Sequence, residues 1–195
     1  SPTPTGEGPV DSPQLILKAT GSTYEPGMPV DLEWKIRLPK SQSLRSNWQL
    51  QVNIPAGWIS AEKQPGTFDS DKQVWKIDSP TASGTLSLVA PDDTSYVEIQ
   101  AAVYDGDTEL FRGSLVQRGK KSLKIEKSGG EIDGNAGKAR IKVKFDKDVL
   151  PEDATISIQA PETLPGSFPY NGKHALELVA EDTKGNRFHK FNSQA

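Results

Sequence analysis

Strict alternation of apolar and polar residues is the feature that most constrains how this chain folds. The alternation occurs in residues 30–38 and again in residues 48–54, where apolar side chains recur at every second position. Successive side chains of a β-strand point to opposite faces, so this period predicts half-buried antiparallel strands rather than amphipathic helices. The same pattern recurs toward the C-terminus. It assigns most large apolar residues to a core and leaves no constellation that demands a chemical role.

Composition also favours an all-β class. The 195-residue chain is 34% hydrophobic, which suits thin sheets with one wet face each, and its 17 Gly and 15 Pro supply turns between short strands. No long helix can be drawn, because Pro and Gly interrupt every candidate stretch. The chain has no Cys, so it offers no disulfide, no thiolate nucleophile and no thiolate metal ligand.

Residues 1–12 are rich in Pro, Ser, Thr and Gly and contain almost nothing to bury. They predict a flexible tether attached to something upstream. A tether of this kind favours an extracytoplasmic protein that is periplasmic, lipid-anchored, on the cell surface or secreted. No stretch is apolar enough to span a membrane, so membrane contact is expected only through an upstream anchor. The net charge of −3 argues against nucleic acid as a partner.

Strand and turn signals predict two domains, at 13–118 and 122–195, with a short basic joint at 119–121. The first domain offers the seven strands of an Ig-type sandwich and the second offers five. The predicted strands are 14–19, 30–38, 48–54, 74–77, 84–89, 96–104, 109–116, 123–127, 138–145, 155–160, 175–181 and 187–191. Asp105-Gly106 predicts a tight hairpin, and residues 183–186 predict another turn.

Three stretches resemble known domains. Residues 24–34 (YEPGMPVDLEW) and 50–58 (LQVNIPAGW) resemble the bacterial Ig-like domains of cell-surface proteins and glycosidase-associated modules, and residues 176–186 (LELVAEDTKGN) are similar to the closing hairpin of bacterial Ig-like repeats. The resemblance implies an all-β fold of two tandem Ig-like antiparallel β-sandwich domains. It concerns turns and core rather than a specific activity.

Four tryptophans lie in the first predicted domain. Trp34, Trp48 and Trp75 are in phase with apolar neighbours and are expected in the core, whereas Trp58 follows a turn and is expected to cap an open end of the sandwich. Carbohydrate modules stack sugar rings on exposed aromatic faces. A sugar ligand would therefore use Trp58 with Trp48 or Tyr24, and we then expect an exposed, coplanar aromatic pair near Trp58.

A basic stripe lies on one face of the predicted strand 138–145. It is about 20 Å long and is formed by Lys138, Arg140, Lys142 and Lys144. The stripe could attract an anionic partner, such as an acidic polysaccharide or a phosphate-bearing envelope component. The simpler interpretation is a wet strand face whose cations keep the edge from pairing with other chains.

Metal and cofactor chemistry has little support in the sequence. The acidic turns at 69–71, 92–93 and 105–107 contain the oxygens that Ca²⁺ prefers, but none has full loop spacing with a distal bidentate Glu. Ordinary exposed turns explain them more simply, so no cofactor is expected. His174 and His189 are out of register for a shared metal, and neither belongs to a catalytic triad.

These observations favour a non-catalytic binding or structural module that recognises another protein or a cell-envelope polymer, for example in adhesion. Recognition would use complementary surfaces or strand addition to an exposed edge. The alternative is a carbohydrate-binding accessory module of a secreted glycoside hydrolase, with a polysaccharide as ligand. An enzyme would need a pocket of convergent carboxylates or Ser and Lys groups, which the sequence does not display.

Overall fold

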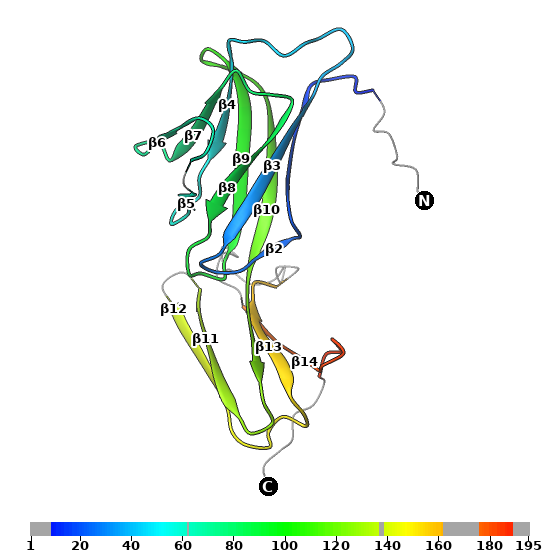
Figure 1. Cartoon of the computed structure of the whole chain (residues 1–195), viewed down its shortest axis with the longest axis vertical. Helices are drawn as coiled ribbons and strands as arrows, with labels where there is room; N and C mark the ends of the chain where they lie inside the picture. The colour runs from blue at the N-terminus through cyan, green and yellow to red at the C-terminus, as the bar shows by residue number, and fades with distance from the viewer. Residues whose placement is uncertain (1–8, 62, 137–138, 162–175, 189–195) are drawn as a thin grey trace, which may run out of the picture. The chain divides into compact units, whose positions relative to one another are not determined.

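The computed structural model describes residues 9–61, 63–136, 139–161 and 176–188, and within these ranges it is all-β with no helix (Figure 1). The all-β prediction is therefore confirmed. Within the described ranges, no helix is long and apolar enough to cross a membrane. The chain divides into two units, which we describe separately as unit 1 (Ser1–Thr20, Val30–Leu88 and Glu98–Leu115) and unit 2 (Gly21–Pro29, Val89–Val97 and Val116–Ala195).

Unit 1 contains two antiparallel sheets. One sheet has the strand order β1 (Gln14–Ala19), β3 (Pro29–Arg37), β8 (Ser83–Val89) and β5 (Ile59–Ser60). The other contains, side by side, β10 (Thr108–Ile125), β9 (Tyr96–Asp105), β4 (Trp48–Asn53), β7 (Val74–Asp78) and β6 (Thr67–Asp69). The β9–β10 neighbourhood confirms the predicted hairpin, whose Gly106 has a φ of 59°.

The predicted alternation fills the core of unit 1. On β3, Leu32, Trp34 and Ile36 are buried and oppose alternate residues of β1 in register. On β4, Leu50 and Val52 are fully buried. Each fully buried Leu or Val side chain stabilises the fold by about 1.5–3 kcal/mol relative to an exposed one. Burial of these alternating apolar side chains is thus the driving force for the packing of the two sheets.

Unit 2 is built on the C-terminal part of β10. Residues 120–125 of that strand pair with β13 (Ala154–Gln159), which pairs with β14 (Glu177–Glu181), while residues 118–119 pair in parallel with β2 (Thr23–Tyr24). A separate hairpin consists of β11 (Gly130–Ala136) and β12 (Ala139–Phe145). The buried core residues come from β10 to β14 and from the segment before β13: Ile125, Ile132, Phe145, Leu150, Ala154, Ile156, Ile158 and Ala180.

The domain boundaries differ from the sequence prediction. The expected joint at 119–121 lies within the uninterrupted strand β10, because the polar residues there continue the ladder with β13. Residues 21–29 and 89–97 were assigned to the first domain, yet they belong to unit 2. Four elements were not predicted: β2, β5 and β6 are short, and β11 is rich in Gly, Asp and Asn, which have low strand propensity.

The predicted C-terminal hairpin is described only in part. The turn at 183–186 is present, and Glu181 forms an isolated bridge with Arg187. Residues 189–191 of the expected last strand, the start of the strand expected at 175–181 and Lys138 lie outside the described residues.

Two glycines let β10 approach its neighbours closely. A Cβ on Gly113, in unit 1, would lie 2.2 Å from the carbonyl oxygen of Leu15, and a Cβ on Gly119, in unit 2, would lie 2.3 Å from the Cα of Thr94. Both obstacles are backbone atoms, which cannot rotate away. A side chain at either position would force the backbone apart.

Replacement of Gly119 tests this packing. We expect Gly119→Ala to lower the free energy of unfolding by about 1–3 kcal/mol or more, because the added methyl overpacks backbone. Gly134→Ala is the matched control in unit 2, since its Cβ would meet only the Ile158 side chain at 3.4 Å, an ordinary contact. Urea unfolding measures both variants, and equal losses would contradict the argument.

Candidate functional site

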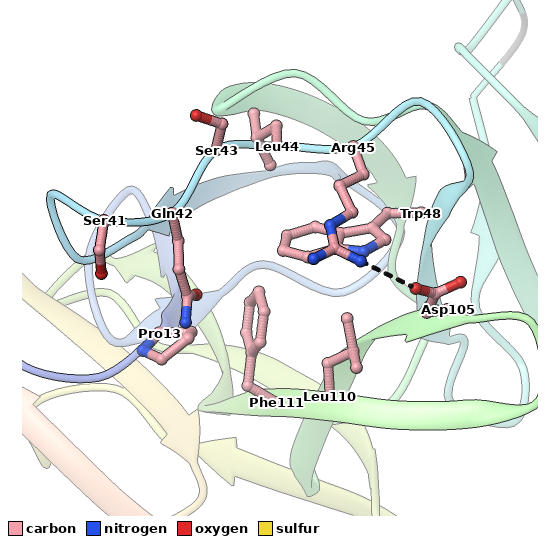
Figure 2. A pocket seen from close by; sticks show the side chains of 10 residues that line it. All are labelled: Pro13, Ser41, Gln42, Ser43, Leu44, Arg45, Trp48, Asp105, Leu110 and Phe111. Atoms are coloured by element: carbon pink, nitrogen blue, oxygen red, sulfur yellow. Dashed lines mark ion pairs between the residues drawn. The ribbon is translucent and has the colours of Figure 1, made fainter.

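Unit 1 contains a pocket of about 430 Å³ (Figure 2). This volume lies within the usual range for ligand pockets, about 300–1,000 Å³. We call it the Trp48 pocket. It is formed by the segment 41–45 before β4, the first residue of β4 and the hairpin end of β9 and β10, and its lining residues are Pro13, Ser41, Gln42, Ser43, Leu44, Arg45, Trp48, Asp105, Leu110 and Phe111.

Trp48 is the central side chain of this pocket. It is the first of the buried residues that alternate with more exposed ones along β4, so its ring lies on the same face as Leu50 and is only 6% exposed. Phe111 packs edge-on against it, with ring centroids 5.9 Å apart and an interplanar angle of 73°. The Nε1 atom of Trp48 is buried and has no hydrogen-bond partner. An unpaired buried donor costs about 1–3 kcal/mol, so this N–H lowers the stability of the pocket wall.

Arg45 and Asp105 supply opposite charges beside the aromatic pair. The Arg45 Nη1 atom lies 3.8 Å from Asp105 Oδ2, and the two side chains are 68% and 32% exposed. The other carboxylate oxygen of Asp105 accepts a hydrogen bond of 2.6 Å from the Asn47 amide. The carboxylate is therefore held from one side, while the guanidinium is loosely paired. Such an exposed pair adds little stability, which leaves its groups available to a ligand.

Figure 2 shows Leu110 and Phe111 pointing from β10 into the pocket, with the Gln42 amide on its far side. The lining therefore combines an apolar wall with amide, hydroxyl, guanidinium and carboxylate groups. These groups suit recognition. Neither His nor Cys lines the pocket, so its Ser hydroxyls have no imidazole base beside them in the described structure.

The aromatic residues expected to form a sugar platform are buried. Trp58 and Tyr24 are each only 4% exposed, so the prediction of an exposed aromatic pair near Trp58 is wrong. Tyr24 belongs to unit 2, where its hydroxyl donates a 3.0 Å hydrogen bond to the Ser95 carbonyl oxygen. Burial, and then the nearby Asp93 carboxylate, raise the pKa of Tyr24. Of the three residues predicted to bind a ligand, Trp48 alone lines the Trp48 pocket.

The core expectations for the other tryptophans are confirmed. Trp34 is 4% exposed and Trp75 is 7% exposed. The Trp75 indole donates a 2.6 Å hydrogen bond to the Pro65 carbonyl oxygen and stacks on Phe68 at 5.9 Å between centroids. Trp75 is therefore fully partnered, in contrast to Trp48.

The basic stripe lies on β12 and carries acidic partners. Arg140 is 2.7 Å from Asp133, Lys142 is 2.9 Å from Glu131 and Lys144 is 3.3 Å from Asp146. Lys138 lies outside the described residues. The face is thus a mixture of both charges, which weakens its field on an anionic polymer. Binding of such a polymer stays a prediction.

The electrostatic centre of this face is Asp133. Hydrogen bonds from Arg140 and then Lys121, at 2.7 and 3.1 Å, lower the pKa of Asp133 to about 2. The ordinary value is about 3.9. Asp133 therefore favours the folded state above about pH 4, and this contribution disappears as the pH falls through about 2.

Carboxylates of the acidic turns accept hydrogen bonds from nearby residues. Asp69 accepts from Lys76 at 2.8 Å and from the Lys72 amide at 3.1 Å, which lower its pKa. Asp93 accepts hydrogen bonds from the Ser95 amide and hydroxyl. Within the described ranges, no group of three or more His, Cys, Asp or Glu side chains is placed to hold a metal ion. His174 and His189 lie outside these ranges.

Sequence reasoning missed most of the pocket. The sequence indicated Asp105 only as a hairpin residue and as part of an acidic turn, and Arg45 and Phe111 belonged to no motif. Their meeting depends on the pairing of Trp48 with Asp105 across β4 and β9, which a period-two pattern does not specify. The one usable signal was the aromatic residue at the start of β4.

Comparison with known proteins does not assign a family. No family model matches the chain, and no curated protein sequence matches it. Among solved structures, the chain is similar to one described as the crystal structure of BslA, a bacterial hydrophobin. The TM-score is 0.36 and the identity is 13%, over 55% of this chain and 99% of that one. A likeness this distant carries no argument about fold or function.

Conservative replacement of tryptophan tests the unpartnered donor. We expect Trp75→Phe to lower the free energy of unfolding by about 1–2 kcal/mol more than Trp48→Phe, because it also removes a made hydrogen bond. Both changes delete a similar ring volume, so urea unfolding of the two variants isolates the N–H. Equal losses would show that the Trp48 N–H is partnered in solution.

The pH dependence of stability tests the ion pairs of Asp133. We expect the urea midpoint of the wild-type protein to fall between about pH 4 and 2, and that of Asp133→Asn to fall less over the same range. Asp146→Asn is the control, because it removes a carboxylate from the same face with one looser partner. If the profile of Asp133→Asn ran parallel to that of the wild type, the role assigned to the Asp133 ion pairs would be contradicted.

Proposed function

We propose that this protein is a non-catalytic binding module that recognises a protein partner through the Trp48 pocket. The observation that carries the proposal is a pocket lined by the Trp48–Phe111 aromatic pair that also holds a loose, exposed Arg45–Asp105 pair. Aromatic and Arg side chains are the residues most enriched at binding hot spots. A peptide segment would place an apolar anchor against Phe111 and a carbonyl or carboxylate acceptor within reach of the exposed Arg45 guanidinium.

We further infer that both units are Ig-like β-sandwiches. Support comes from the two facing sets of antiparallel strands in unit 1, with Trp34 buried on β3, and from the core of unit 2 between its three-stranded sheet and the β11–β12 hairpin. The sequence resemblance of residues 24–34 and 50–58 to bacterial Ig-like domains agrees with this inference. Rigid sandwiches of this kind present loops to partners.

The proposed location is extracytoplasmic. It rests on the Pro-, Ser-, Thr- and Gly-rich residues 1–12, a composition that suits a spacer between a surface and a folded part. Fractionation of the source cells, with antibodies to the protein and to a cytoplasmic marker, tests this placement. Recovery with the cytoplasmic marker would exclude it.

Selection from a random phage-displayed peptide library tests the proposed function. We expect enrichment of peptides that bind the wild-type protein, and at least tenfold weaker binding of the synthetic peptide to Arg45→Ala and Phe111→Ala by calorimetry. Phe68→Ala is the control, since Phe68 is an exposed aromatic outside the pocket. Binding that survives both pocket changes, or no enrichment at all, would overturn the proposal.

The second candidate function is carbohydrate binding. Burial of Trp58 and Tyr24 removes the aromatic platform first considered for it. A different surface of unit 1, the polar face of the sheet containing β4, independently favours a sugar ligand and is described next.

A further inference from the structure

The solvent-facing side of β4 and its neighbours carries an ordered row of amides. Gln49, Gln51 and Asn53 follow one another at every second position of β4. Across the ladder they oppose Tyr104, Ala102 and Gln100 of β9 in that order, so all six side chains share one face. We call this surface the amide face. The three β4 amides extend over about 13 Å, more than the width of one sugar ring.

The amide face is hollowed at its centre. A depression of about 210 Å³ lies on it, and its lining residues are Gln51, Asn53, Gln100, Ala101, Ala102, Tyr104, Glu109 and Arg112. Ala102 is the small residue opposite Gln51, so a methyl group occupies a position where larger side chains would fill the hollow. Tyr104 adds an aromatic ring at one side, which suits the C–H face of a sugar.

Two hydrogen-bond chains hold these polar groups in place. Gln51 Nε2 donates to Gln49 Oε1 at 2.7 Å, and Gln49 Nε2 donates to Asp78 Oδ1 at 2.7 Å. This chain fixes the orientation of both amides and leaves the Gln51 oxygen outside it.

The second chain runs from β9 to β10. The Tyr104 hydroxyl donates to Glu109 at 3.3 Å, and Arg112 donates to the same carboxylate through Nε and Nη2 at 2.6 and 3.0 Å. Burial, and then Glu109, raise the pKa of Tyr104, so its hydroxyl keeps its proton at neutral pH. Groups that are already oriented lose little conformational entropy when a ligand binds.

The charges on the amide face are balanced. Arg112 is paired with Glu109, and Lys76 is paired with Asp69 at 2.8 Å. Asp78 adds a carboxylate at the end of the Gln49 chain. An anionic polymer would meet these carboxylates with no unpaired cation among the residues named here, whereas a neutral ligand meets oriented donors and acceptors. A peptide strand would pair with a sheet edge rather than with side chains on a sheet face.

We propose that the amide face binds a neutral glycan chain laid across β4, with ring hydroxyls paired to Gln51, Asn53, Gln100 and Arg112 and one sugar ring against Tyr104. The hydroxyl groups of a neutral sugar are both donors and acceptors, as are these amides. The site shares no lining residue with the Trp48 pocket and does not depend on the proposed peptide binding. Either proposal can fail without the other.

Affinity electrophoresis in gels that contain soluble neutral polysaccharides tests the site, with xyloglucan, galactomannan and mixed-linkage β-glucan as probes and alginate as the anionic comparison. We expect retardation by at least one neutral polymer and none by alginate. Gln51→Ala and Tyr104→Ala should each weaken retention about tenfold, the effect of losing one or two good contacts. Ala102→Leu should do the same by filling the depression without removing a polar group.

Two controls separate binding from folding and from other surfaces. Thr85→Ala changes an exposed side chain on β8, in the other sheet of unit 1, and should retain binding. Far-ultraviolet circular dichroism and urea midpoints show which variants remain folded, and Asn53→Ala, at an exposed position, serves if Tyr104→Ala is unstable. No retardation in any neutral gel, retardation by alginate alone, or full retention by folded Gln51→Ala and Ala102→Leu would overturn the proposal.

Discussion

The close approach of backbone to backbone along β10 is the constraint on which much of this structure depends. One strand of 18 residues supplies a ladder in each unit, and it can do so because Gly113 and Gly119 carry no side chain. In unit 1 the space at Gly113 admits the Leu15 carbonyl, and in unit 2 the space at Gly119 admits the backbone of Thr94. Hydrophobic burial drives both cores, but it does not determine this local geometry. The absence of a Cβ at these two glycines determines it.

Unit 2 also depends on buried polar contacts between segments that are distant in sequence. The fully buried Gln117 donates its amide to the Gly21 carbonyl at 3.1 Å, while its Oε1 atom has no partner. Thr94 donates through its hydroxyl to the Asn135 carbonyl at 2.7 Å. Replacing one member of such a pair leaves its partner buried and unsatisfied, which costs more than the bond itself contributes. These two contacts join residues 21–29 and 89–97 to the C-terminal strands, and the Tyr24 hydroxyl joins the two segments to each other.

This explains which parts of the fold could be predicted from sequence. The period-two pattern located β1 at its observed ends and β3, β4 and β9 to within a residue or so, because each buries one apolar face. It missed β11, whose Gly130 and Gly134 lie under Ile125 and Ile158 and leave few apolar side chains to show a period. It also misplaced the boundaries of the units. Those depend on the polar contacts above, and a single polar residue such as Gln117 carries no periodic signal.

The two candidate sites differ in how their polar groups are satisfied, and this difference separates their chemistry. In the Trp48 pocket the Arg45 guanidinium is exposed and only loosely paired, so an acceptor on a ligand can bind it while an apolar group packs against Phe111. On the amide face two hydrogen-bond chains, from Gln51 to Asp78 and from Tyr104 and Arg112 to Glu109, already orient several groups, and a ligand gains from that fixed orientation. The first arrangement selects a single anchor. The second suits a neutral and hydroxyl-rich chain, because its hydroxyls can meet donors and acceptors on β4, β9 and β10.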